Sequence, residues 1–282
     1  MKKIIITGCN GQLGREINKY YSDKRGFEFV NTDVDELDIT NIDAVMELAT
    51  AEKPYAIINC AAYTAVDACE TNQDLAFKIN TLGARNLAIA AEAVGAKLVH
   101  ISTDYVFDGT KEEPYMEYDK TNPQSVYGVT KSRAEEMIRH FSRRYFIFRT
   151  AWLYGDGKNF VKTMLKLSED RDSVTVVADQ FGTPTSTFEL VKAIDSIMFT
   201  ENYGTYHATC EGSCNWAEFA EEIFRLAGTD TKVVPTTTEA YNAPAPRPLH
   251  SILENYMLRM VGGYTFADWH DAIAVYMKEL GY

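Results

Sequence analysis

The sequence has no long apolar run and no excess of basic residues. No apolar stretch approaches the roughly 18 residues that a membrane helix needs. The apolar run near the N-terminus ends after Ile4, Ile5 and Ile6, which is too short for the core of a signal peptide. The net charge of −12 argues against binding to nucleic acid or to an anionic membrane, because both require a basic surface. We therefore expect a cytoplasmic protein with no nucleic-acid or membrane partner.

Cysteine is present in neither a disulfide pattern nor a metal-binding pattern. The five cysteines are an odd number and are scattered along the chain, which does not suggest a disulfide framework. Cys210 and Cys214 are the nearest pair, but no second pair and no clustered histidines follow them. The sequence therefore names no metal ligands, and whether a divalent metal is bound stays open. It also shows no internal repeat and no low-complexity segment.

Short apolar runs alternate with helical stretches through the first half of the chain. Strands are expected at residues 2–8, 27–33, 55–62, 96–103 and 144–150. They are continuous apolar runs, which is typical of a parallel sheet with helices on both faces. The sequence predicts an α/β fold with a doubly wound parallel sheet of the Rossmann type at residues 1–151. Residues 152–282 are expected to form mainly a smaller C-terminal α/β lobe that binds the substrate, with some elements returning to the sheet.

A glycine turn follows the first predicted strand. Gly8, Gly11 and Gly14 are spaced as GxxGxxG and open the first helix. Glycine in this place allows a tight turn and lets the backbone approach a pyrophosphate, which the helix N-terminus then stabilises. Asp33, near the end of the second strand, is placed to bind a ribose, and Asp38 would flank the adenine. The alternatives are a turn without a ligand and two solvated loop acids.

The segment from Ser125 to Glu136 contains a tyrosine and a lysine four residues apart. If this segment is helical, Tyr127 and Lys131 lie on one face about one turn apart. Taken alone, such a pair is often an inert surface contact. The functional alternative is a phenol whose pKa is lowered by a nearby cation, so that it transfers a proton near neutral pH.

Together these features resemble the extended short-chain dehydrogenase/reductase family over nearly the whole chain. The glycine turn, "INTLGARNL", "STD" after the fourth strand and YxxxK carry the resemblance. More closely, "NCAAYTAVDACE", "HISTDYVFDG", "FRTAWLYG" and "DQFGTPTS" are similar to members that reduce the 4-keto group of dTDP-4-dehydro-L-rhamnose. The resemblance implies synthesis of dTDP-L-rhamnose, a nucleotide sugar used for cell-surface polysaccharides.

The resemblance also implies roles for individual residues. Tyr127 would give a proton to the keto oxygen, and Lys131 would lower the pKa of that tyrosine and hold the nicotinamide ribose. Thr103 would hydrogen-bond the keto oxygen, and Asn80 would support the active-site helix. The implied cofactor contacts are Gly8, Gly11, Gln12, Leu13, Gly14, Asp33, Asp38, Ile39, Ala62, Tyr63, Thr64, Tyr127 and Lys131, and the implied substrate contacts are Thr103, Asp104 and Trp152.

One further substrate contact is expected from its chemistry. Arg247 lies in the proline-rich segment at residues 242–251, and its guanidinium group suits the oxygens of the substrate diphosphate. The alternative is an ordinary surface arginine.

The reaction and the cofactor are less strongly indicated. Related 4,6-dehydratases carry Thr-Asp-Glu, whereas Tyr105 follows Thr103 and Asp104 here, which disfavours elimination. Another keto-sugar-nucleotide reductase or epimerase, or a non-catalytic cofactor-binding regulatory subunit, remains an alternative. Residues 31–40 contain no basic side chain, which favours NADH, with NADPH as the alternative because Arg15 follows the glycine turn. The nucleotide base, the exact sugar and the oligomeric state stay open, and a homodimer is one option.

Overall fold

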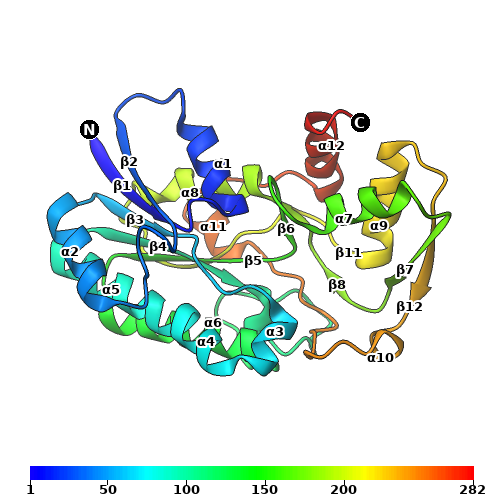
Figure 1. Ribbon diagram of the computed structural model, residues 1–282, viewed down its shortest axis with the longest axis horizontal. Coiled ribbons are helices and arrows are strands. Elements are labelled where there is room, and N and C mark those ends of the chain that lie inside the picture. Colours follow the sequence, from blue (N-terminus) through cyan, green and yellow to red (C-terminus); the bar gives the residue numbers. More distant parts are fainter.

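A six-stranded parallel sheet forms the centre of the computed structural model, which describes residues 1–282 (Figure 1). Its strand order is β10-β5-β4-β3-β1-β2. The chain places β2 on one side of β1 and β3 on the other. Ligands bind in open α/β sheets at such a reversal, beyond the carboxyl ends of the strands. The strands are β1 (Lys2–Thr7), β2 (Phe27–Thr32), β3 (Ala56–Asn59), β4 (Lys97–Thr103), β5 (Tyr145–Thr150) and β10 (Gly204–His207).

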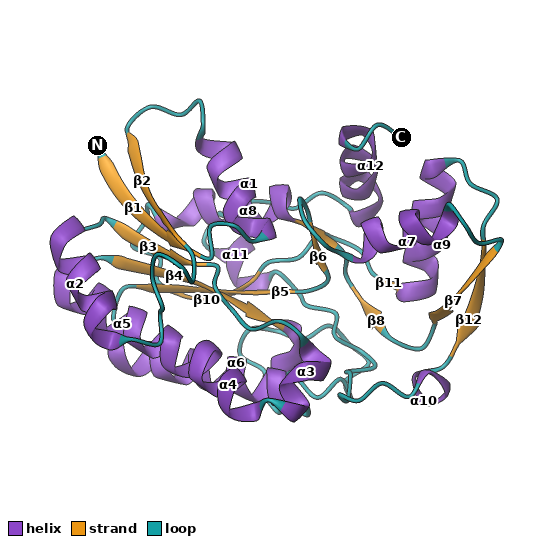
Figure 2. Cartoon of the chain, viewed as in Figure 1, coloured by secondary structure: helices purple, strands orange, loops and turns teal.

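Helices cover both faces of this sheet (Figure 2). The side chains of Ile4 and Ile6 belong to one buried core, whereas Ile5 between them belongs to a second core on the opposite face. A strand that is buried on both faces has no polar side, which explains the continuous apolar runs. The predicted doubly wound sheet is confirmed. One face carries α1 (Gln12–Tyr21) and α8 (Thr187–Met198), and the other carries α2 (Ile42–Glu52), α5 (Ala84–Val94) and α6 (Val126–Phe141).

The helical stretch before β4 is divided into three parts. It consists of α4 (Gln73–Phe77), a π-helical segment η1 (Lys78–Gly83) and α5, which ends at Gly95 in the left-handed conformation. Asn80 lies in the π-helical segment. Its side chain accepts a hydrogen bond from the Tyr63 N–H at 2.7 Å and donates to the Thr130 hydroxyl at 3.0 Å. The supporting role implied for Asn80 therefore has a structural basis.

The C-terminal lobe is built from short elements around α9 (Figure 1). Strand β10 lies within the residues expected to form mainly this lobe, but it pairs with β5 of the main sheet and is thus one of the elements that return to it. Because α8 also packs against α1, the chain crosses between the two parts, and the boundary at residues 151 and 152 stays a prediction.

None of the helices is both long and apolar enough to cross a membrane. The remaining elements are α3 (Val66–Thr71), η2 (Asp104–Val106), β6 (Leu153–Tyr154), α7 (Phe160–Ser168), β7 (Ser173–Val177), β8 (Phe181–Gly182), β9 (Thr185–Ser186), β11 (Cys214–Asn215), α9 (Trp216–Ala227), β12 (Lys232–Thr236), α10 (Thr238–Tyr241), α11 (Tyr256–Met260) and α12 (Trp269–Glu279).

Candidate active site

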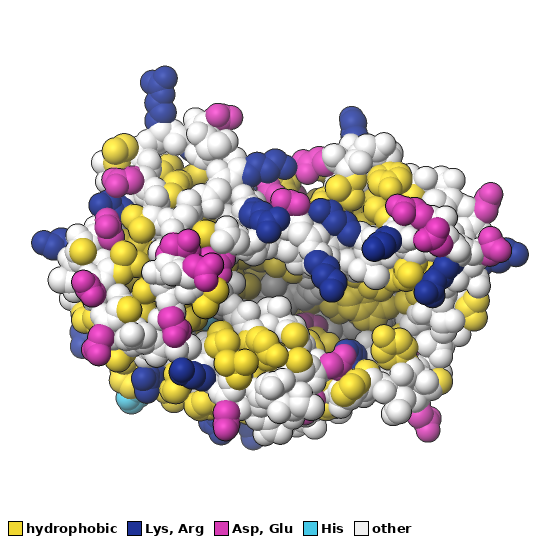
Figure 3. Space-filling view, in the orientation of Figure 1, with side chains coloured by type: hydrophobic (Ala, Val, Ile, Leu, Met, Phe, Trp, Pro, Cys, Tyr) yellow, Lys and Arg dark blue, Asp and Glu magenta, His cyan; other side chains and the backbone are white.

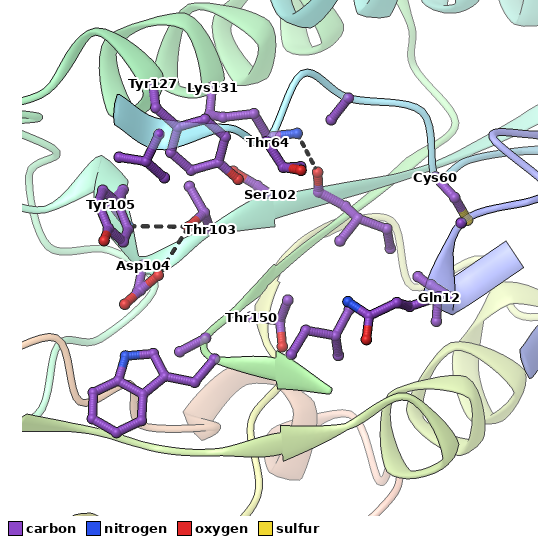
Figure 4. Close-up of a pocket in the computed structure, with 18 of the residues that line it drawn as sticks. Gln12, Cys60, Thr64, Ser102, Thr103, Asp104, Tyr105, Tyr127, Lys131 and Thr150 are labelled. Atoms are coloured by element: carbon purple, nitrogen blue, oxygen red, sulfur yellow. Dashed lines mark hydrogen bonds between the residues drawn. The ribbon is translucent and has the colours of Figure 1, made fainter. Parts of the chain in front are cut away.

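A cavity of about 560 Å³ lies beyond the carboxyl ends of the central strands, where the two parts of the molecule meet. Figure 3 shows the hollow, with Lys and Arg side chains gathered along one rim. Its lining comes from the glycine turn, the ends of β4 and β5, the first turns of α6 and the start of α9. The predicted catalytic side chains, Thr103, Tyr127 and Lys131, all line this one cavity (Figure 4).

The start of α6 positions Tyr127. Ser125 caps the helix by accepting a hydrogen bond from the Gly128 N–H at 3.1 Å. A Cβ atom on Gly128 would lie 2.2 Å from the backbone oxygen of Tyr105, so only glycine allows this close approach. The ring of Tyr105 meets the Tyr127 ring nearly edge-on, with centroids 5.5 Å apart. Lys131 lies one helical turn further on and lines the same cavity, as the spacing predicted.

The end of β4 supplies a linked pair of polar side chains. The Thr103 hydroxyl donates to Asp104 Oδ1 at 2.8 Å and accepts from the Tyr105 N–H at 3.3 Å. The second carboxylate oxygen of Asp104 is buried and has no hydrogen-bond partner. Burial raises the pKa of Asp104 to about 6. Thus Asp104, which lines the cavity, keeps one carboxylate oxygen without a hydrogen-bond partner in the protein.

The electrostatics of Tyr127 differ from the sequence-based expectation. Burial raises its pKa, the charge of Asp104 raises it further, and a hydrogen bond with Thr103 opposes the rise. Lys131 instead donates a 2.5 Å hydrogen bond to the carbonyl oxygen of Ile101, and burial lowers the pKa of Lys131 to about 8. The residues of the protein alone therefore do not give Tyr127 the lowered pKa that was predicted from the presence of Lys131.

A second cavity, of about 620 Å³, continues from the first along the glycine turn. The two cavities share Gly11, Cys60 and Ala62 in their linings. Gly8 has a φ angle of 67°, and a Cβ atom there would lie 2.7 Å from the Ala61 nitrogen. Glycine at this position therefore allows both the positive φ angle and the close approach of the turn to Ala61, in the place where a pyrophosphate would lie. The residues present fit a dinucleotide across the two cavities.

The acidic end of the second cavity contains the predicted ribose and adenine contacts. Asp33 accepts hydrogen bonds from the N–H groups of Asn10 at 3.0 Å and Val34 at 2.8 Å, which orient its carboxylate. Arg15 forms an ion pair with Asp156 at 3.3 Å and does not line this cavity. The other predicted residues in this lining are Gly8, Gly11, Asp38, Ile39, Ala62 and Tyr63, and Lys78, which the sequence analysis missed, joins them.

Most of the remaining predicted contacts line the first cavity. They are Gln12, Leu13, Thr64, Asp104 and Trp152.

Gly14 and Arg247 line neither cavity. A Cβ atom on Gly14 would lie 2.5 Å from the Gly8 oxygen, so this glycine allows α1 to pack against the turn. Arg247 donates to Asp67 at 3.0 Å and to the Ala245 carbonyl at 2.9 Å, so its charge is already paired.

Two lining residues carried no recognisable sequence signal. Trp216, at the start of α9, stacks on Trp152 with ring centroids 3.6 Å apart and planes 12° apart. A Cβ atom on Gly182 would lie 2.7 Å from the Trp152 ring, so that glycine makes room for the stack. Lys158 lines the cavity without a carboxylate partner. Both residues come from distant segments that only the tertiary fold brings together. No group of three or more His, Cys, Asp or Glu side chains is arranged to hold a metal ion.

A parallel sheet with a glycine turn after β1, and with Thr103, Tyr127 and Lys131 around one cleft, defines a nicotinamide-dependent oxidoreductase of the extended short-chain dehydrogenase/reductase type. The match to a family model makes the assignment narrower. The chain belongs to the family described as the RmlD substrate binding domain, whose model matches residues 1–281.

Two curated relatives match over almost their whole length. The dTDP-4-dehydrorhamnose reductase of Aggregatibacter actinomycetemcomitans is 40% identical, over 97% of this chain and 97% of that protein. The spore coat polysaccharide biosynthesis protein SpsK of Bacillus subtilis is 38% identical, over 99% of this chain and 98% of that protein. This chain therefore corresponds to nearly the full length of each relative.

Solved structures agree closely in shape. A dTDP-4-dehydrorhamnose reductase from Clostridium acetobutylicum is 52% identical, with a TM-score of 0.97 and coverage of 99% of this chain and 100% of that one. The dTDP-4-dehydrorhamnose reductase of Bacillus anthracis, solved in complex with NADP, is 43% identical, with the same TM-score and coverage. The NADP in that relative agrees with a nicotinamide cofactor and does not decide between NADH and NADPH for this chain.

Proposed function

We propose that the protein reduces the 4-keto group of dTDP-4-dehydro-L-rhamnose to give dTDP-L-rhamnose. The observation that carries this proposal is the convergence of Thr103, Tyr127 and Lys131 on one cavity that continues into the glycine-turn cavity. The names of the relatives support the choice of substrate.

The chain's own residues provide for the proton that a ketone reduction needs. A bound nicotinamide would supply the hydride, held by the glycine turn, Asp33 and Lys131. Tyr127 then gives its hydroxyl proton to the keto oxygen. Thr103 has a single hydroxyl proton, which it donates to Asp104, so this hydroxyl must rotate to hydrogen-bond the keto oxygen. The free oxygen of Asp104 can meanwhile accept a hydrogen bond from a sugar hydroxyl.

The rest of the cavity suits a nucleotide sugar. The stacked Trp152 and Trp216 rings form a broad apolar wall. Lys158 lies in the same lining, and a lysine ammonium is a common partner for phosphate oxygens. We propose Lys158 as a contact for the substrate diphosphate. Arg247, the contact expected from the sequence, would have to leave Asp67 to serve in the same way.

We propose that NADH is used at least as well as NADPH. The oriented carboxylate of Asp33 would accept a hydrogen bond from a ribose 2′-hydroxyl and repel a 2′-phosphate. The pairing of Arg15 with Asp156 supports NADH, because it engages the nearest basic side chain of the turn. Lys78, in the same lining as Asp33, is the feature that favours NADPH.

The function is tested by incubating the purified protein with a panel of 4-keto sugar nucleotides while following the absorbance of NADH or NADPH. We expect oxidation of the cofactor with dTDP-4-dehydro-L-rhamnose and formation of dTDP-L-rhamnose, identified by mass spectrometry and NMR. If the cofactor is consumed only with a different keto sugar nucleotide, the protein is a reductase for that substrate instead. Binding of the cofactor without turnover of any sugar would assign a regulatory subunit.

A further inference from the structure

A chain of buried polar side chains runs from the sheet to Lys131. Thr7 on β1, Asn59 on β3 and His100 on β4 lead to Lys131 on α6, and each is no more than 2% exposed. The Thr7 hydroxyl donates to Asn59 Oδ1 at 2.8 Å. Asn59 Nδ2 lies 3.0 Å from His100 Nδ1, and His100 Nε2 lies 3.4 Å from Lys131 Nζ.

The orientation of the Asn59 amide is determined by its neighbours. Its Oδ1 atom accepts a hydrogen bond from the backbone N–H of Ala61 at 3.1 Å, in addition to the one from Thr7. A backbone N–H can only donate, so the atom that faces it must be the amide oxygen. The amide nitrogen of Asn59 therefore faces His100.

This orientation determines the tautomer of His100. The amide nitrogen of Asn59 donates to His100 Nδ1, so Nδ1 must be without a proton. A neutral imidazole then carries its proton on Nε2, which faces the amine of Lys131. Burial and the charge of Lys131 keep the pKa of His100 well below its usual value, so the ring stays neutral.

The Nε2–H of His100 opposes the charged form of Lys131. An ammonium group has no lone pair and cannot accept a hydrogen bond, whereas an uncharged amine can. The other groups that act on Lys131 are the Ile101 carbonyl oxygen, which accepts its 2.5 Å hydrogen bond, Glu135 on the same helix and Cys60 after β3. Glu135 forms an ion pair with Arg149 at 2.7 Å, so the negative charge of Glu135 acts on Arg149 as well as on Lys131.

We infer that His100 is a positioning residue for the reduction, because Asn59 aims its Nε2–H at Lys131 and thereby makes the ammonium form of Lys131 easier to deprotonate. This inference rests on the proposed function in one respect, the participation of Lys131 in the reaction. According to this inference, the Asn59–His100 pair sets the upper pH limit of activity. That limit should lie at the pKa of Lys131. The rate falls as the pH rises through this pKa and Lys131 loses its proton.

The tautomer is tested without any activity measurement. In protein labelled with ¹⁵N at histidine, NMR distinguishes protonated from unprotonated ring nitrogens, and the His100 signals are assigned by their loss in His100→Leu. We expect a proton on Nε2 and none on Nδ1 in the wild-type protein. In Asn59→Asp a carboxylate oxygen replaces the amide donor, and the proton should move to Nδ1. A wild-type proton on Nδ1 would overturn the inference, whatever the protein catalyses.

The consequence for Lys131 is tested with the pH profile of kcat/KM. His100→Leu removes the opposing donor, and Asn59→Asp turns it away, so in both variants the alkaline limit should rise by about one pH unit. Thr7→Val is the matched control, since the Ala61 N–H still orients Asn59, and its limit should stay at the wild-type pH. Circular dichroism and the melting temperature show whether each variant folds.

The two ways in which the idea can fail give different results. An unchanged alkaline limit in a folded Asn59→Asp variant with the proton on Nδ1 would refute the link to Lys131. A wild-type protein with the expected tautomer but no reductase activity would instead refute the proposed function.

Discussion

Replacing Tyr127 with phenylalanine removes one oxygen from the centre of the cavity. The ring remains, and with it the edge-on contact with Tyr105 at 5.5 Å, so the fold and the cofactor site should be retained. What is lost is the only hydroxyl assigned to protonate the keto oxygen. Loss of a general acid typically slows a reaction about 10²–10⁴-fold, which corresponds to about 2.7–5.4 kcal/mol of transition-state stabilisation.

The assay compares wild type, Tyr127→Phe and a neighbouring control. Tyr105→Phe removes a hydroxyl from the same cavity, and we expect its kcat to stay within a few fold of wild type. Cofactor affinity, measured by fluorescence titration, should change little in either variant. A Tyr127→Phe enzyme with nearly wild-type kcat would show that the proton comes from another group, and Asp104 would then be the next candidate because its pKa is raised to about 6.

Four other substitutions test the rest of the site. Lys131→Met should weaken both turnover and cofactor affinity, and a cofactor titration equal to wild type would contradict the ribose role. Asp33→Ala should shift the ratio of kcat/KM values toward NADPH, and a wild-type preference for NADPH of tenfold or more, about 1.4 kcal/mol, would show that Asp33 does not select the ribose as argued. Lys158→Ala should raise KM for the nucleotide sugar with little change in kcat, whereas an unchanged KM would remove Lys158 from the diphosphate site. Gly8→Ala forces a side chain into a left-handed conformation against the Ala61 nitrogen at 2.7 Å, so it should lower the melting temperature and weaken cofactor binding.

The sequence predicted the parts of the site that depend on local order. The glycine turn, Asp33 and the Tyr127–Lys131 pair each follow a strand or begin a helix, and a parallel sheet brings such positions to one edge. All three line one or the other of the two cavities. The alternation of strands and helices was sufficient for the central sheet because its inner strands, β1, β3, β4 and β5, are buried on both faces.

Features that depend on long-range packing escaped the sequence analysis. The stack of Trp216 on Trp152 joins segments that are distant in the chain. The sequence allowed for elements that return to the sheet, and β10, which pairs with β5, is such an element, but no local pattern showed which element it would be. Arg247 has the right chemistry for a phosphate, but Asp67, far away in the sequence, already pairs with it. Spacing along a chain does not show which charges are already neutralised.

The π-helical segment that carries Asn80 has a consequence for how this chain tolerates change. A π turn contains one residue more than an α turn, so it acts as a one-residue insertion held inside a helix. Deleting a single residue from Lys78–Gly83 would let an ordinary helix run through this segment, and the residues within it, Asn80 among them, would lose the wide turn that sets their present direction. Asn80 could not then face both Tyr63 and Thr130. Length in this segment is thus constrained as well as residue identity, and a one-residue deletion here would disconnect the loop after β3 from the helix that carries Tyr127.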